Sequence, residues 1–152
     1  MEDLQAYVYE HIPIVRKNNF KIVEFGERIE VSGNFKEHIN HRNSVFGGSL
    51  SNALIISAWA YARKIIHGFD CANTIIVIQT QEVKFILPVT KKFTSVNKEV
   101  SNQIKDKALA MLNKFGKTRL EIESYITHEE ENDILASFKG QFAIIKKSSA
   151  DI

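Results

Sequence analysis

Apolar and polar residues alternate along several segments of the chain, as in strands that turn one face to a core. The predicted strand segments are 22–35, 74–78, 82–86, 93–100, 120–127 and 136–144. A glycine interrupts the first of them at position 26, which predicts a bulge or bend there. Because short connections join most consecutive segments, the pattern favours antiparallel pairing within one sheet.

Two further segments show a helical pattern and have recognisable ends. Residues 3–11 are predicted to form a short helix that ends before Pro13. Residues 101–115 place apolar side chains on one stripe, and Gly116 supplies the stop signal.

A longer helix is predicted from Gly47 to about His67, with Asn43 or Ser44 as its cap and Gly68 at its end. Its middle is apolar nearly all round, so we expect it to be buried on most sides. One buried helix wrapped by one antiparallel sheet is the hotdog architecture, an α+β fold. Such a sheet exposes edge strands, and pairing of edges favours a homo-oligomer.

Composition and charge narrow the class of protein. The 152 residues predict one domain, residues 1–152, and 44% apolar residues exclude a disordered chain. A net charge of +2 does not indicate binding to nucleic acid or to an anionic membrane. A single cysteine, Cys71, excludes an internal disulfide. The N-terminus lacks the pattern of a signal peptide, and the apolar run 53–62 is too short to span a bilayer, so we expect a cytoplasmic protein.

Three blocks of the sequence resemble a family of hotdog thioesterases that is also found behind acetyltransferase domains in some bacteria. The first block is Asn40 with Phe46-Gly47-Gly48-Ser49-Leu50 and the later pair Ala58-Trp59; the others are Ile76 to Val89 and His11 to Ile14. The resemblance covers nearly the whole chain. It implies a hotdog fold and an acyl-CoA or acyl-carrier-protein thioester as substrate. No cofactor is predicted.

The chain departs from this family's pattern at positions that carry chemistry elsewhere in it. Phe46 stands where wider hotdog thioesterases often have histidine, and residues 52–57 hold no carboxylate. His41 and Thr80 stand where the closer group commonly has aspartate. The identity of the catalytic base therefore stays open.

Thioester hydrolysis forms a tetrahedral oxyanion, and fixed hydrogen-bond donors lower its energy. The first N–H groups of a helix have no intrahelical partner and lie at the positive end of its dipole. We therefore predict the Gly48 N–H as oxyanion donor, with the Ser49 N–H as a second candidate. The alternative is that the glycines only let the helix cross a strand closely. The Ser49 hydroxyl lacks a nucleophile-elbow sequence and is interpreted as a capping or packing group.

Three side chains are candidates for holding or activating water. Asn40 is able to orient a water or the carbonyl, or else forms a turn within its loop. His41 has a pKa suited to general-base work, although loop histidines are more often solvated. Glu82 is a candidate base if it faces the helix start of a partner chain; if it faces outward, it pairs with Lys84.

The acyl group is expected to lie between helix and sheet. The predicted substrate-binding residues are Phe46, Gly47, Leu54, Trp59 and Phe85, several of which are equally well explained as core. His38 and His41 have a ligand-like spacing, but no further ligand follows, so no metal site is predicted.

The sequence therefore predicts hydrolysis of an acyl thioester by a homodimer or a dimer of dimers. Two alternatives compete with it: a non-catalytic acyl-CoA-binding module, and an acyl-thioester dehydratase on the same fold.

Overall fold

The computed structural model describes residues 3–67, 73–128 and 132–148. The predicted helix end at Gly68, Cys71 and most of the acidic run 129–133 lie outside the described residues. The elements along the chain are α1 (Leu4–His11), α2 (Pro13–Lys17), β1 (Lys21–Phe25), β2 (Arg28–Gly33), α3 (Gly47–Ile65), β3 (Thr74–Phe85), β4 (Phe93–Asn97), α4 (Asn102–Phe115), β5 (Lys117–Thr127) and β6 (Ala136–Lys146).

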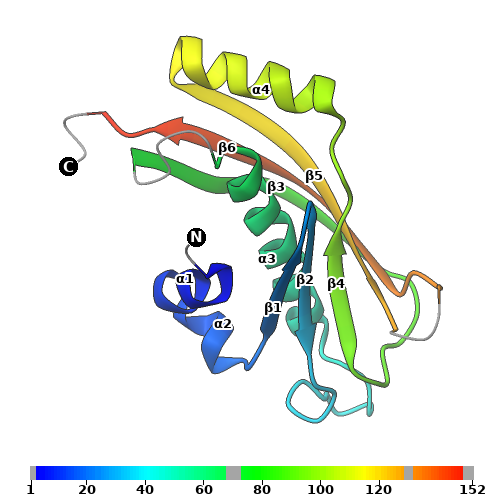
Figure 1. Ribbon diagram of the computed structural model, residues 1–152. Coiled ribbons are helices and arrows are strands. Elements are labelled where there is room, and N and C mark those ends of the chain that lie inside the picture. The colour runs from blue at the N-terminus through cyan, green and yellow to red at the C-terminus, as the bar shows by residue number, and fades with distance from the viewer. Residues whose placement is uncertain (1–2, 68–72, 129–131, 149–152) are drawn as a thin grey trace.

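The strands form one antiparallel sheet in the order β1-β2-β4-β5-β6-β3. The sheet curves around α3, which lies against its inner face (Figure 1). Leu54 and Tyr61 of α3 are fully buried, together with the inward residues of the strands. This is the hotdog fold, so the predicted architecture is confirmed.

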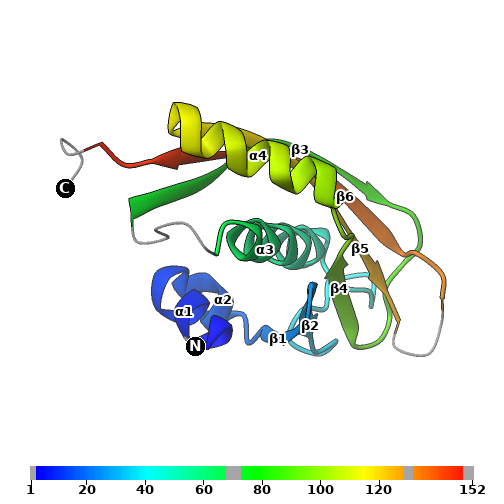
Figure 2. The ribbon, with the colours of Figure 1, turned by 45° about the horizontal axis from the view of Figure 1, so that its top comes forward.

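The helices α1 and α2 cover the side of α3 that the sheet leaves open (Figure 2). The predicted α1 is confirmed, and the Asp3 carboxylate caps it by accepting a hydrogen bond from the Gln5 N–H at 3.0 Å. The Tyr7 ring of α1 stacks on Trp59 of α3 with ring centroids 6.5 Å apart. The short α2 was not predicted, because five residues are too few to show a helical period.

Two predictions about strand boundaries were wrong. Segment 22–35 is a hairpin rather than one bent strand, because Gly26 adopts φ +56° at the turn between β1 and β2. Segments 74–78 and 82–86 belong to a single strand, β3, which pairs along β6 with a register shift between Ile78 and Thr80. The polar residues after this shift, Thr80 and Gln81, continue the strand because each pairs with a residue of β6.

The helix predicted for residues 101–115 is confirmed as α4. The Ser101 hydroxyl accepts a hydrogen bond from the Ile104 N–H, and Gly116 ends the helix at φ +68°. α4 lies on the outer face of the sheet, opposite to α3 (Figure 2). Of its apolar stripe only Ala108 and Leu112 are buried.

β3 forms one edge of the sheet and is the longest strand. Most of its side chains are exposed, including the apolar residues Ile75, Val77 and Ile78. A long edge strand with apolar side chains is a template for pairing with another strand. Among the described residues, no helix has the length and apolar character needed to cross a membrane.

Candidate functional site

The start of α3 is held by a tightly bonded loop. The Val45 N–H donates to the Val89 carbonyl at 2.7 Å, and the Phe46 N–H donates to the His38 carbonyl at 2.7 Å. Ile39 and Val45 form an isolated β-bridge across the loop. These bonds fix the first turn of the helix relative to the sheet, which is the preorganisation that a catalytic donor requires.

The predicted cap of α3 was wrong. The helix begins at Gly47 with Phe46 in the cap position and no side-chain cap. The Asn40 carboxamide oxygen instead accepts from the Ser44 N–H at 3.2 Å, and Asn43 takes φ +58° within that turn. Val45 then bonds to Val89 and forms the isolated bridge with Ile39, so Asn43 and Ser44 lie too early in the chain to cap the helix.

The helix α3 begins with two glycines, which lie between two aromatic rings. The Ser49 and Leu50 N–H groups donate to the Phe46 carbonyl at 2.9 and 3.2 Å, so the predicted Ser49 donor is already engaged. Within the described part of the chain, the N–H groups of Gly47 and Gly48 make no hydrogen bond. They are therefore the two donors at the positive end of α3 that remain available to a ligand.

The rings of Phe46 and Phe85 flank these glycines and are both exposed, at 58% and 57%. A Cβ at position 48 would overlap the Phe46 ring, whereas a Cβ at position 47 would only touch the Phe85 ring at 3.4 Å. A side chain at position 48 would therefore force the exposed Phe46 ring to move. Phe46, Gly47 and Phe85, three of the residues predicted to bind the acyl group, thus lie together beside the predicted donor at Gly48.

Asn40 and His41 lie on the loop beside this helix start. They share an open depression of about 360 Å³ with His38, Phe46 and Ser49. The Asn40 oxygen also accepts from the Arg42 N–H at 2.8 Å, so the side chain forms the predicted turn within the loop. His41 is exposed.

The structure does not bring Glu82 to the helix start of its own chain. Glu82 lies on the outer face of β3, opposite Lys139 of β6, and pairs with Lys84 at 3.5 Å. That is the outward arrangement considered from the sequence.

Leu54 and Trp59 also lie away from the two glycines. Leu54 is fully buried, and its carbonyl accepts hydrogen bonds from the hydroxyls of Ser57 and Ser124. The Trp59 indole N–H donates to the Ile76 carbonyl at 3.3 Å near the other end of α3. In the single chain both residues serve the core.

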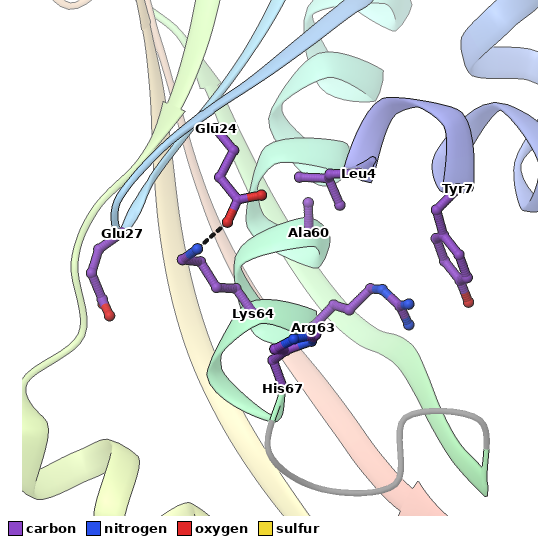
Figure 3. A pocket seen from close by; sticks show the side chains of 8 residues that line it. All are labelled: Leu4, Tyr7, Glu24, Glu27, Ala60, Arg63, Lys64 and His67. Atoms are coloured by element: carbon purple, nitrogen blue, oxygen red, sulfur yellow. Dashed lines mark hydrogen bonds and ion pairs between the residues drawn. The ribbon is translucent and has the colours of Figure 1, made fainter. Parts of the chain in front are cut away.

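A second pocket, of about 240 Å³, lies at the C-terminal end of α3 (Figure 3). Lys64 and Glu24 form an ion pair across it, and the Arg63 guanidinium lies 3.6 Å from the centroid of the Tyr7 ring. Lys64 and Glu24 thus neutralise each other, Glu27 pairs with Lys105 outside the pocket, and the pocket holds none of the predicted site residues.

Residues 1–146 match the family described as "Putative thioesterase (yiiD_Cterm)". The chain belongs to this family. No curated protein sequence matches the chain.

Solved structures resemble this yiiD_Cterm family member over most of their length. A protein of unknown function from Chlorobaculum tepidum has a TM-score of 0.84 at 22% identity, over 95% of this chain and 93% of its own. A "putative thioesterase" from Shewanella oneidensis has a TM-score of 0.79 at 16% identity, over 93% and 94%. A Pseudomonas aeruginosa protein described as a "Probable Thioesterase" has a TM-score of 0.79 at 14% identity, over 94% and 93%. These likenesses show the shared fold.

Sequence reasoning missed one residue beside the helix start of this yiiD_Cterm family member. His38 is 5% exposed, stacks on Phe20 at 4.8 Å between centroids, and bonds through Nδ1 to the Ser49 hydroxyl at 2.9 Å. Its Nε2 is buried and has no hydrogen bond to any residue that the structure describes. Burial lowers the pKa of His38, against smaller opposing effects of the Asn18 backbone and of Glu37. A neutral imidazole therefore holds the Ser49 side chain in the first turn of α3.

The sequence places His38 in a polar loop shortly before the glycine pair, and this was the one signal available for it. A sequence does not show whether a loop histidine is buried, so this position was equally consistent with a solvent-exposed side chain.

Proposed function

We propose that this chain hydrolyses an acyl thioester of CoA or of a carrier protein at the start of α3. Water forms the new C–O bond and the C–S bond breaks. One proton of the water goes to the leaving sulfur and the other is released, so the products are a carboxylate, a free thiol and a proton. The observation that carries the proposal is the pair of unengaged N–H groups at Gly47 and Gly48, between two exposed phenylalanines, in a chain of a thioesterase family.

In this proposal the Gly48 N–H donates to the developing oxyanion. Removing one such donor from an enzyme lowers kcat by about 10²–10³-fold. Phe46 and Phe85 offer apolar surface to the acyl group on either side of that donor. Leu54 and Trp59 would border only the deeper part of an acyl tunnel.

Water is held, in the proposal, at the loop side of the helix start. Asn40 has one amide proton left after its bond to the Ser44 hydroxyl, and His41 shares the same depression. Glu82 acts as base only if the outer face of its strand meets the site of another chain.

We also propose a homodimer, alone or paired into a dimer of dimers, that forms through the β3 edges. The support is the length and apolar exposure of this edge strand. Light scattering should give a mass of two or four chains of 17.3 kDa. A mass of one chain would contradict the pairing.

The test of hydrolysis is thiol release from a panel of acyl-CoA and acyl-carrier-protein thioesters. Gly48→Ala should reduce kcat/KM by about 10²-fold, because the new Cβ displaces Phe46 over the donor. Gly116→Ala is the control outside the site and should change kcat/KM little, because its Cβ would meet only Lys146, at 4.0 Å. Equal rates in both variants would refute the role of Gly48.

Two further variants test the water-holding residues. Asn40→Ala and Glu82→Gln are compared with Glu121→Gln, which removes another outer-face carboxylate paired to a lysine. A loss of rate in Asn40→Ala or Glu82→Gln beyond that of Glu121→Gln supports its role.

The second candidate function is a non-catalytic module that binds acyl-CoA. It is favoured by the absence of any carboxylate along residues 52–57 of α3. Saturable binding of an acyl-CoA with no thiol release across the panel would establish it in place of hydrolysis.

A further inference from the structure

The outer face of the sheet is divided into two unlike halves. Toward the C-terminal end of β3, lysines and glutamates of β3 and of the neighbouring strands and their ends pair with one another. The pairs are Lys84–Glu82 at 3.5 Å, Lys139–Glu121 at 3.1 Å and Lys98–Glu123 at 2.7 Å. This half is balanced in charge by its own residues.

The other half of the outer face forms a groove beside α4, with a volume of about 510 Å³. Its floor is Ala143 and Ile145 of β6, and its wall on the α4 side is Ile104, Ala108 and Met111. Ile104 and Met111 are exposed at 51% and 39%. α4 lies on the outer face of the sheet and packs mainly against β5 (Figure 2). The volume lies in the ordinary range of small-molecule sites, about 300–1,000 Å³.

Three cationic side chains border this apolar floor. Lys117 and Arg119 lie opposite Ile145 and Ala143 on the adjacent strand β5, and Lys107 projects from α4. Over the described ranges, none of the three lies within ion-pair distance of a carboxylate. The contrast with the paired half of the same face leaves this groove with an excess of positive charge.

Arg119 is also oriented by a neutral partner. Its Nε donates to the side-chain oxygen of Gln79 on β3 at 2.9 Å. An arginine has five N–H donors, so the four on its terminal nitrogens remain for an anion. Arginine binds carboxylates through such paired donors in a bidentate geometry.

We propose that this groove binds a fatty carboxylate, with its head group at Arg119 and Lys117 and its chain along Ala143, Ile145 and Met111. The charge selects an anion, and the apolar floor selects a hydrocarbon chain. The site lies on the face of the sheet opposite to α3, so its ligand does not depend on hydrolysis at Gly48.

The test is calorimetric titration of the full chain with monomeric dodecanoate. We expect saturable binding that Arg119→Gln and Lys117→Gln each weaken by about tenfold or more, the effect of losing a charge-assisted hydrogen bond. Lys139→Gln is the matched control, since it removes an outer-face lysine that is paired to Glu121, and it should leave the affinity unchanged. Dodecanol, which has the chain without the charge, should bind at least tenfold more weakly.

Three outcomes would overturn the proposal. The first is no saturable binding of dodecanoate; the second is binding that is insensitive to Arg119→Gln and Lys117→Gln, which would place the ligand elsewhere, including at the start of α3. The third is that monomeric dodecanoate does not bind, while the chain either binds anionic phospholipid vesicles or self-associates in a way that Met111→Glu abolishes. Thermal melting of each variant confirms that it is folded before its affinity is compared.

Discussion

The hydrogen bond between His38 and Ser49 offers a sharp test of how the helix start is held. Replacing Ser49 with alanine removes the partner of Nδ1 at 2.9 Å, while Nε2 is already without one. The buried imidazole then has no hydrogen bond at either nitrogen. A buried polar group left unsatisfied costs about 1–3 kcal/mol, more than the net value of the bond itself.

The magnitude is measurable in a domain of this size. A loss of 1–3 kcal/mol is a sizeable part of the usual total stability of about 5–15 kcal/mol. For a chain of about 150 residues it corresponds to a fall in Tm of about 2–12 °C. Denaturant unfolding followed by fluorescence and by circular dichroism supplies the free energy of unfolding.

A double-mutant cycle separates this cost from a general loss of packing. In His38→Leu the imidazole is gone, so adding Ser49→Ala leaves no buried nitrogen without a partner. We expect Ser49→Ala to cost about 1 kcal/mol less in the His38→Leu background than in the wild type. Equal costs in the two backgrounds would refute the reasoning.

The same histidine predicts a pH dependence. Burial lowers the pKa of His38 below its ordinary value of 6.5, so the unfolded chain takes up a proton before the folded chain does. The contribution of neutral His38 is present above about pH 6.5 and is lost as the pH falls toward the lowered folded pKa. His38→Leu should therefore flatten the stability profile between about pH 7.5 and pH 5.5; an unchanged profile would contradict the assignment.

Two further predictions concern the frame around the site. The hydrogen bond from Lys105 is the main cause that lowers the pKa of Glu27, so the stabilisation from this pair is present above about pH 4.5 and is lost as the pH falls further. Glu27→Gln should therefore reduce the loss of stability in acid. The change should be under about 1 kcal/mol in chemical unfolding at pH 3 to 6, since the pair is partly exposed. Gly116→Ala should destabilise the chain by about 1–2 kcal/mol because of φ +68° and not by a clash, since Lys146 is the nearest neighbour at 4.0 Å. Gly116→Asn should cost less, and a loss as large as that of alanine would contradict the conformational explanation.

The sequence pattern predicted the helices α3 and α4 but not the bounds of β3 or the hairpin of β1 and β2. The apolar run in α3 and the stop at Gly116 are local features, so the sequence predicts both elements directly. The bounds of β3 are different: its central residues are polar and exposed, and only pairing with β6 makes them a strand. The hairpin at Gly26 was likewise seen as a bend, because a glycine marks a change of direction without giving its angle.

The candidate site divides in the same way. The glycine pair, Phe46 and Asn40 are visible as a motif, and the structure places them around one helix start. Which N–H groups are engaged, and which face of β3 carries Glu82, depend on register and loop bonding between distant residues. Neither follows from local spacing.

What the sequence by itself determined is the architecture, through hydrophobic periodicity, and the place of the helix start, through its two glycines. Burial and charge partnership were decided only by the tertiary structure. His38 is neutral because Phe20 and Phe93 from other segments enclose it. Arg119 has no carboxylate partner in the described part of the chain, where the sheet places Ala143 opposite it. Both properties arise from contacts between residues far apart along the chain, which a local pattern does not encode.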